Sequence, residues 1–171
     1  MRLKATLMDA RQMRRVIIRM ANEIIEDNRG ADRLTLVGIG KRGVPIARDI
    51  ASVIEAVECV KVPMIELPDF DGEKVERAEI TAERVGGLSV VIVTDVLYTG
   101  YTARAAIDAV VRARRPEKVR LAVMVDRGGK ALPLSPDYVG VKAELGKNDI
   151  VSVSVGKIDG EDRVDVYGAD E

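Results

Sequence analysis

The chain has 171 residues, of which 47% are hydrophobic and 32% are charged, with a formal net charge of −1 and no histidine. This length can bury a core of its own, so a single domain is expected over residues 1–171. The absence of histidine excludes Ser-His-Asp and Cys-His catalysis and histidine-bound zinc, which leaves carboxylates, Lys, Arg, hydroxyls and backbone amides as catalytic groups.

The single cysteine and the hydropathy pattern bear on the compartment. One cysteine forms no internal disulfide, and Cys59 lies among valines, so we expect a small buried side chain there rather than a reactive thiol. No apolar stretch approaches the roughly 18 residues that a membrane span needs, and no apolar leader pattern follows Met1. A cytoplasmic protein without membrane contact is therefore expected.

A first helix is predicted near the amino end. Asp9 is a residue type that caps helix amino ends, and Gly30 is one that ends helices. Between them, apolar side chains recur at the spacing of one helix face, at Met13, Ile17, Met20 and Ile24. The outer face of this helix is basic.

The next segment predicts a strand, a loop and a helix. Residues 34–39 are strand-like, and the glycines of 40–43 are expected to break the strand. Pro45 suits the first position of the helix that follows. A short strand is then expected at 59–65, while the acidic stretch 67–87 has no clear period and predicts a loop or a hairpin.

The most informative run extends from residue 90 to residue 102. An apolar stretch predicts a buried parallel strand at 88–94, and Asp95 stands at its carboxyl end. Gly100 permits a tight turn, after which the free N–H groups at the start of a helix over 102–115 point at an anion. The run therefore predicts a phosphate cradle with Asp95 beside the group that carries the phosphate. The alternative is a buried strand followed by an ordinary helix cap.

The rest of the chain continues the alternation. Pro116 ends the helix, and strands are expected at 119–125, 150–155 and 163–167, the last two separated by a turn at Asp159. Alternating strands and helices predict an α/β fold with a doubly wound, mainly parallel sheet. Ligands of such sheets bind where loops leave the carboxyl ends of the strands.

A second glycine-bracketed loop, at 38–43, also follows a strand. It offers Lys41 and Arg42 where an anion would be received, and this arrangement suits a pyrophosphate. The alternative is a charged turn between a strand and a helix that binds nothing.

The run at 90–102 resembles the phosphoribosyl-pyrophosphate (PRPP) motif of type I phosphoribosyltransferases. Over nearly its whole length the chain also resembles one family of them, the bifunctional pyrimidine operon attenuation regulator/uracil phosphoribosyltransferases. The segments that carry this resemblance are 13–26, 36–39, 42–45, 95–100, 121–128, 132–133, 137–140 and 159–164. The resemblance implies a type I phosphoribosyltransferase fold with a small hood and a flexible loop, and a homo-oligomer.

The resemblance implies the reaction of uracil and PRPP to UMP and pyrophosphate, with Mg²⁺ bound together with PRPP. Asp95, Lys41 and Arg42 are then the candidate catalytic residues: Asp95 holds the ribose and the Mg²⁺–PRPP unit, and the two cations receive the pyrophosphate. Asp126 and Arg127 are the candidates for the uracil side, the alternative being a capped strand end with a structural Asp–Arg contact. The candidate substrate contacts in the cradle are Thr94, Val96, Leu97, Tyr98, Thr99, Gly100, Tyr101 and Thr102.

The chain departs from the family pattern in two places. Thr94 replaces the first of two consecutive acids, at what is expected to be the solvent-facing end of the strand. The region 67–72 lacks the Tyr-Arg pair of the family's flexible loop, and the loop here is acidic. Two alternatives therefore stay open: a non-catalytic nucleotide-sensing regulator that keeps the cradle, and a phosphoribosyltransferase for another base.

The regulator function of the family implies leader mRNA as a partner of the first helix. Arg15 and Arg19 are the candidate contacts, together with Arg11 on the same face. A net charge of −1 and the scarcity of aromatic residues for base stacking do not favour an extensive RNA surface. The alternative is an arginine stripe on a solvated helix face.

Overall fold

The computed structural model describes residues 1–69, 80 and 89–168, so most of the predicted loop at 67–87 lies outside the described residues. The elements in chain order are β1 (Arg2–Met8), α1 (Ala10–Asn28), β2 (Leu34–Ile39), α2 (Gly40–Glu58), β3 (Met64–Leu67), β4 (Ser89–Leu97), α3 (Tyr101–Ala113), β5 (Lys118–Asp126), β6 (Tyr138–Lys142), β7 (Ile150–Ser154), α4 (Gly156–Asp159) and β8 (Arg163–Gly168).

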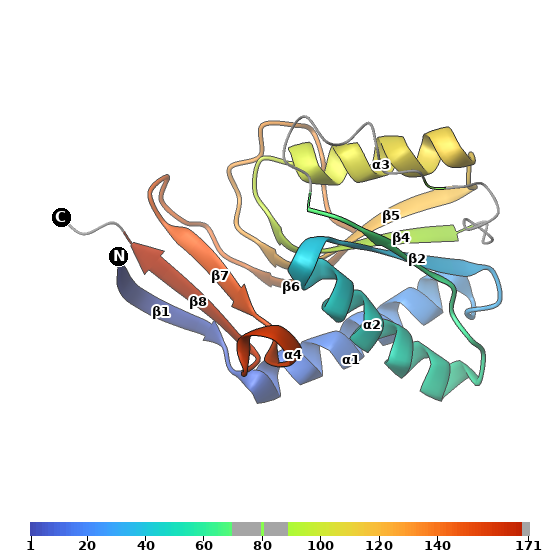
Figure 1. The fold of residues 1–171 in the computed structure, drawn as a ribbon, viewed down its shortest axis with the longest axis horizontal. Helices are drawn as coiled ribbons and strands as arrows, with labels where there is room; N and C mark the ends of the chain where they lie inside the picture. Colours follow the sequence, from blue (N-terminus) through green and yellow to red (C-terminus); the bar gives the residue numbers. More distant parts are fainter. Residues whose placement is uncertain (70–79, 81–88, 169–171) are drawn as a thin grey trace.

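The central sheet has five parallel strands in the order β3-β2-β4-β5-β6. Figure 1 shows α1 and α2 on one face of this sheet and α3 on the other. All of β2 and the first two thirds of β4 are buried, since helices cover both faces. This arrangement confirms the predicted α/β fold with a doubly wound, mainly parallel sheet, and it accounts for the continuous apolar runs in the sequence.

A second, smaller sheet contains β1, β8 and β7 in antiparallel order. It pairs the two ends of the chain, with Leu3 opposite Tyr167, and stands beside the central sheet in Figure 1. We call it the hood sheet. The sequence predicted β7 and β8, whereas β1 was missed although polar and apolar residues alternate from Arg2 to Leu7.

The predicted boundaries of the first helix are confirmed. The Asp9 side chain accepts a hydrogen bond from the Gln12 N–H (2.8 Å), and the Gln12 side chain accepts one from the Asp9 N–H (2.9 Å), a complete capping box. At the other end Arg29 is left-handed, and the Gly30 N–H bonds to the Ile25 carbonyl at 3.0 Å.

Strand β2 ends at Ile39, as predicted, but the loop expected at 40–43 is wrong, because α2 starts at Gly40 and Pro45 lies inside the helix. The reason for Gly43 is close packing rather than a loop. A Cβ added to Gly43 would lie 2.8 Å from the Val93 carbonyl oxygen. Gly43 is therefore required for the close contact of a helix with a strand. It allows the first turn of α2 to pack against β4.

The expectation for Cys59 is also wrong. Cys59 is exposed and ends α2 in a left-handed conformation, with φ of 56° and its N–H bonded to the Glu55 carbonyl (3.0 Å). The strand predicted at 59–65 begins only at Met64. The short valine-rich stretch between α2 and β3 follows the left-handed turn and is not part of a strand. Its apolar composition therefore did not indicate strand pairing.

Around the predicted cradle, β4 continues beyond residue 94 to Leu97, because its pairing with β5 continues through Val96 and Val125. Helix α3 starts and ends within two residues of its predicted bounds. None of the described helices has the length and apolar character needed to cross a bilayer.

Candidate functional site

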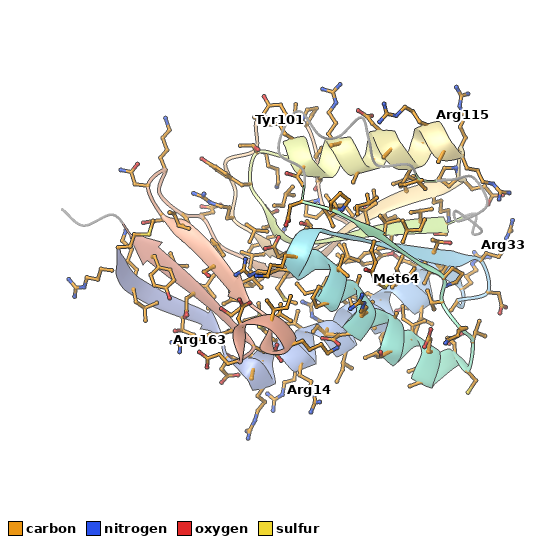
Figure 2. The ribbon with its side chains drawn as sticks, viewed as in Figure 1. Arg14, Arg33, Met64, Tyr101, Arg115 and Arg163 are labelled. Carbon is orange, nitrogen blue, oxygen red and sulfur yellow. The ribbon has the colours of Figure 1, made fainter. Side chains whose placement is uncertain are left out.

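A pocket of about 240 Å³ lies at the carboxyl end of β4. It is lined by Thr94, Val96, Leu97, Tyr98, Thr99, Gly100, Thr102 and Ala103. All of these except Ala103 were predicted from the sequence. Ala103 was missed because its side chain shows no polar group that would mark it. The predicted Tyr101 is not in the lining; it is 60% exposed and stands at the start of α3, as Figure 2 shows.

The pocket is built around the amino end of α3. Gly100 is the N-cap of this helix with φ of +94°, and no side chain caps the first N–H groups. Uncapped N–H groups at a helix amino end bind anions, aided by the helix dipole. Two leucine side chains pack against Gly100, since a Cβ added there would lie 3.2 Å from Leu134 and 3.5 Å from Leu132. The arrangement therefore suits one phosphate group.

Asp95 stands beside this pocket, half-buried near the end of β4. Its Oδ1 accepts hydrogen bonds from the Val96 N–H (2.8 Å) and the Thr94 hydroxyl (3.3 Å). Burial raises the pKa of Asp95, and the hydrogen bonds and the charge of Arg42 oppose that rise without cancelling it. The carboxylate is thus oriented by the backbone and held where charge is poorly solvated.

The structure corrects the expected exposure of Thr94. Thr94 is only 5% exposed, because β4 continues beyond it and α2 covers it. A Cβ added to Gly43 of α2 would lie 3.1 Å from the Thr94 Cα. Thr94 is therefore a buried wall of the pocket and does not stand at a solvent-facing strand end.

The amino end of α2 carries both predicted cations. The Lys41 N–H lies 3.3 Å from each carboxylate oxygen of Asp69, and the Lys41 side chain is exposed. The Asp69 carboxylate sits directly over Gly40, where an added Cβ would come within 1.9 Å of it. Arg42 donates from Nη2 to Oδ1 of Asp159 at 3.2 Å. An internal carboxylate thus occupies the anion position that the sequence predicted for pyrophosphate.

Asp126 is the last residue of the neighbouring strand β5, Arg127 follows it, and both are buried. Asp126 accepts hydrogen bonds from the Gly128 N–H (3.2 Å) and from Lys130 Nζ (2.8 Å). The Arg127 guanidinium stacks on the ring of Tyr98, 3.8 Å from its centroid, and donates to the Gly146 carbonyl at 3.1 Å. The two residues contact different partners rather than each other, and Arg127 reaches the pocket through Tyr98.

The two arginines predicted for RNA differ in their surroundings. Arg19 donates from Nη2 to the carbonyls of Val139 (2.7 Å) and Gly140 (3.0 Å), and from Nη1 to Glu23 (2.8 Å). Its side chain therefore joins α1 to β6. Arg15 is exposed.

The fit of a magnesium ion can be tested on the donor set. Among the residues that the structure describes, no three Cys, Asp or Glu side chains come together as a metal site. Mg²⁺ is commonly held by one or two carboxylates together with substrate phosphates. The single carboxylate of Asp95 fits a cation that arrives with PRPP and does not fit one bound by the protein alone.

Known proteins resemble the chain in sequence over almost its full length. Residues 5–157 match the family model described as Phosphoribosyl transferase domain. The bifunctional protein PyrR of Clostridium acetobutylicum is 43% identical, over 98% of this chain and 99% of that protein. The bifunctional protein PyrR of Thermus aquaticus is also 43% identical, over 98% of this chain and 97% of that protein.

Solved structures resemble the chain in fold. The hypoxanthine phosphoribosyltransferase of Trypanosoma cruzi has a TM-score of 0.71 at 20% identity, with 98% of each chain covered. The HGPRT-ase of Leishmania tarentolae in complex with GMP has a TM-score of 0.71 at 17% identity, with 97% of each chain covered. These identities speak for the shared fold alone and confirm the predicted type I architecture. Together with the relatives at 43% identity, they confirm the resemblance noted in the motifs: the chain belongs to the phosphoribosyltransferases and, among them, to the bifunctional PyrR family.

Proposed function

We propose that this phosphoribosyltransferase transfers the phosphoribosyl group of PRPP to uracil, forming UMP and pyrophosphate, with Mg²⁺ bound together with PRPP. The observation that carries the proposal is the pocket at the carboxyl end of β4, which is lined by the uncapped start of α3 and by Thr94 and Val96, the residues on either side of Asp95. The family resemblance further suggests a cytoplasmic homo-oligomer.

The 5′-phosphate is assigned to the loop from Tyr98 to Thr102. Four of its five residues line the pocket, and no side chain caps the helix that starts there, so its N–H groups would be available to a phosphate. Asp95 would accept hydrogen bonds from the ribose hydroxyls and stabilise the positive charge that develops at the anomeric carbon as the bond to pyrophosphate breaks. Half-burial strengthens such an interaction, because water competes with it less.

Pyrophosphate is assigned to the amino end of α2. The Asp69 carboxylate over Gly40 supports this assignment, since it shows an anion accepting the Lys41 N–H. Pyrophosphate would replace Asp69 there, with Lys41 and Arg42 as counter-charges. Mg²⁺, when bound, would neutralise phosphate charge, and Asp95 is the side chain that would hold it.

Uracil is assigned to the side of the pocket formed by the segment after β5. Arg127 begins that segment next to Asp126, the last residue of β5, and Tyr98 connects it to the phosphate loop. Both charged side chains bind partners within the protein. They would therefore act on uracil indirectly, by holding the backbone of this side of the pocket in place.

Formation of UMP from uracil, PRPP and Mg²⁺ is the test. Asp95→Asn keeps an oxygen that can accept the Val96 N–H but removes the charge. We expect kcat/KM for PRPP to fall about tenfold to a hundredfold, the effect of losing a charge-assisted hydrogen bond worth roughly 1.5–3 kcal/mol. Asp108→Asn is the control, because Asp108 is an exposed carboxylate on α3 whose ion-pair partner is Arg104.

Two outcomes would contradict the proposal in distinct ways. UMP binding in calorimetry without any turnover would favour the non-catalytic nucleotide sensor. Turnover with another base and none with uracil would favour a phosphoribosyltransferase for that base.

We propose RNA as a second partner, bound along the exposed face of α1. The relatives are named bifunctional proteins, which favours a second activity, and Arg11 and Arg15 are exposed on this helix. Arg15→Gln should weaken binding of single-stranded RNA and lower the dependence of log affinity on log salt by about one unit. Arg112→Gln, an exposed arginine on α3, is the control. Equal weakening by both variants would exclude a site on α1.

A further inference from the structure

A short turn of the hood sheet is tied to the helix that carries the pyrophosphate residues. Helix α4 lies between β7 and β8, and two ion pairs join it to α2: Arg42 with Asp159 (3.2 Å) and Asp49 with Lys157 (2.7 Å). Only the first of these pairs includes a residue of the candidate site. The second is a contact of the same kind about two turns further along α2, and it includes no residue of the candidate site.

The Asp159 carboxylate is itself held in place. Its Oδ2 accepts a hydrogen bond from the Val155 N–H at 2.9 Å, while Oδ1 accepts the one from Arg42. The Gly156 N–H is bound by Asp162 at 2.7 Å, so both ends of the turn are fixed by side chains. The carboxylate therefore cannot rotate away from Arg42 without losing its backbone partner.

Arg42 has unused hydrogen-bonding capacity. Asp159 takes a hydrogen bond from Nη2, and the buried Nε has no hydrogen-bond partner in the described structure. A guanidinium has several N–H donors in a rigid fork, which suits two oxygens of one anion. Arg42 also acts on Asp95, whose pKa its charge lowers against the effect of burial. The Arg42 guanidinium thus interacts with two carboxylates, Asp95 near the pocket and Asp159 of α4.

We propose that Asp159 is a positioning residue: by binding Arg42 from the hood, it holds the guanidinium ready to receive pyrophosphate. This inference rests on the proposed function, because it takes Arg42 as a pyrophosphate contact. A free arginine side chain loses rotamer freedom when it binds a ligand. Holding it beforehand removes that cost from the binding step.

The test compares Asp159→Asn with Lys157→Gln, which breaks the other ion pair of the same turn. We expect Asp159→Asn to raise KM for PRPP, and the Kd of pyrophosphate with Mg²⁺ in calorimetry, about threefold to tenfold, the effect of ordering one long side chain. KM for uracil should not change. Asp159→Glu should recover part of the loss, and Lys157→Gln should leave both pyrophosphate and PRPP binding unchanged.

Two results would overturn the inference, and a third would refute only the proposed function. Equal effects of Asp159→Asn and Lys157→Gln would mean that the turn only docks the hood. Unchanged or tighter pyrophosphate binding by Asp159→Asn would mean that Asp159 competes with the ligand for Arg42. The third result is a protein that makes no UMP but binds pyrophosphate, with weaker binding in Arg42→Gln. It would refute the uracil reaction, and the calorimetric comparison of Asp159→Asn with Lys157→Gln would still decide the role of Asp159.

Discussion

Replacing Gly100 by valine is expected to abolish binding of PRPP and UMP. Gly100 has φ of +94°, and an added Cβ would meet Leu134 at 3.2 Å. A β-branched residue strains this conformation by about 1–3 kcal/mol, and the first N–H groups of α3 would turn away from the phosphate. Together with lost hydrogen bonds to a charged group, an affinity loss of at least about a hundredfold is expected. Calorimetric titration with UMP measures it.

Gly30→Val is the matched control for this substitution. Gly30 also has a positive φ, of +114°, and follows α1, where its added Cβ would meet only Glu58 at 3.4 Å. Both variants should lower the melting temperature, but only the Gly100 variant should lose UMP. A folded Gly100→Val protein that binds UMP normally would show that the phosphate cradle lies elsewhere.

Replacing Thr94 by aspartate is expected to destabilise the unliganded protein. Thr94 is 5% exposed and adjoins Asp95, whose pKa is already raised by burial. A second carboxylate adds a buried like charge, for which a loss of roughly 3 kcal/mol in the free energy of unfolding is expected. Urea denaturation at about pH 7.5 measures this loss, and Thr94→Asn, which adds bulk without charge, is the control.

The pH dependence of that variant follows from the same charges. Burial and the like charge raise the pKa of both carboxyls, so the folded state binds more protons than the unfolded state. The penalty is therefore fully present above the raised pKa values and disappears as the pH falls toward about 4. Addition of PRPP with Mg²⁺ should also relieve it, since cations pair with the acids. An unchanged free energy of unfolding at neutral pH would show that residue 94 is better solvated than its burial indicates.

Much of the site is encoded locally and could be predicted from the sequence. The run from 90 to 102 predicted the buried strand, the turn at Gly100 and the helix that form the pocket, because a continuous apolar run, a glycine and a helix start each have a local physical signature. Asp9, a residue type that caps helices, gave the first helix its correct start for the same reason.

The contacts between distant segments were decided by the tertiary structure. Gly43 could not be distinguished from a loop glycine until α2 packed on β4, and that packing is also what buries Thr94. The partners of Arg42 and Arg127 lie far along the chain, at Asp159 and Gly146. A charged side chain carries no local sign of its partner, because strand order and register bring the two together. The sequence by itself thus determined the strand, the turn and the helix that line the proposed phosphate site, and the packing of sheets and helices decided which charged side chains lie near it.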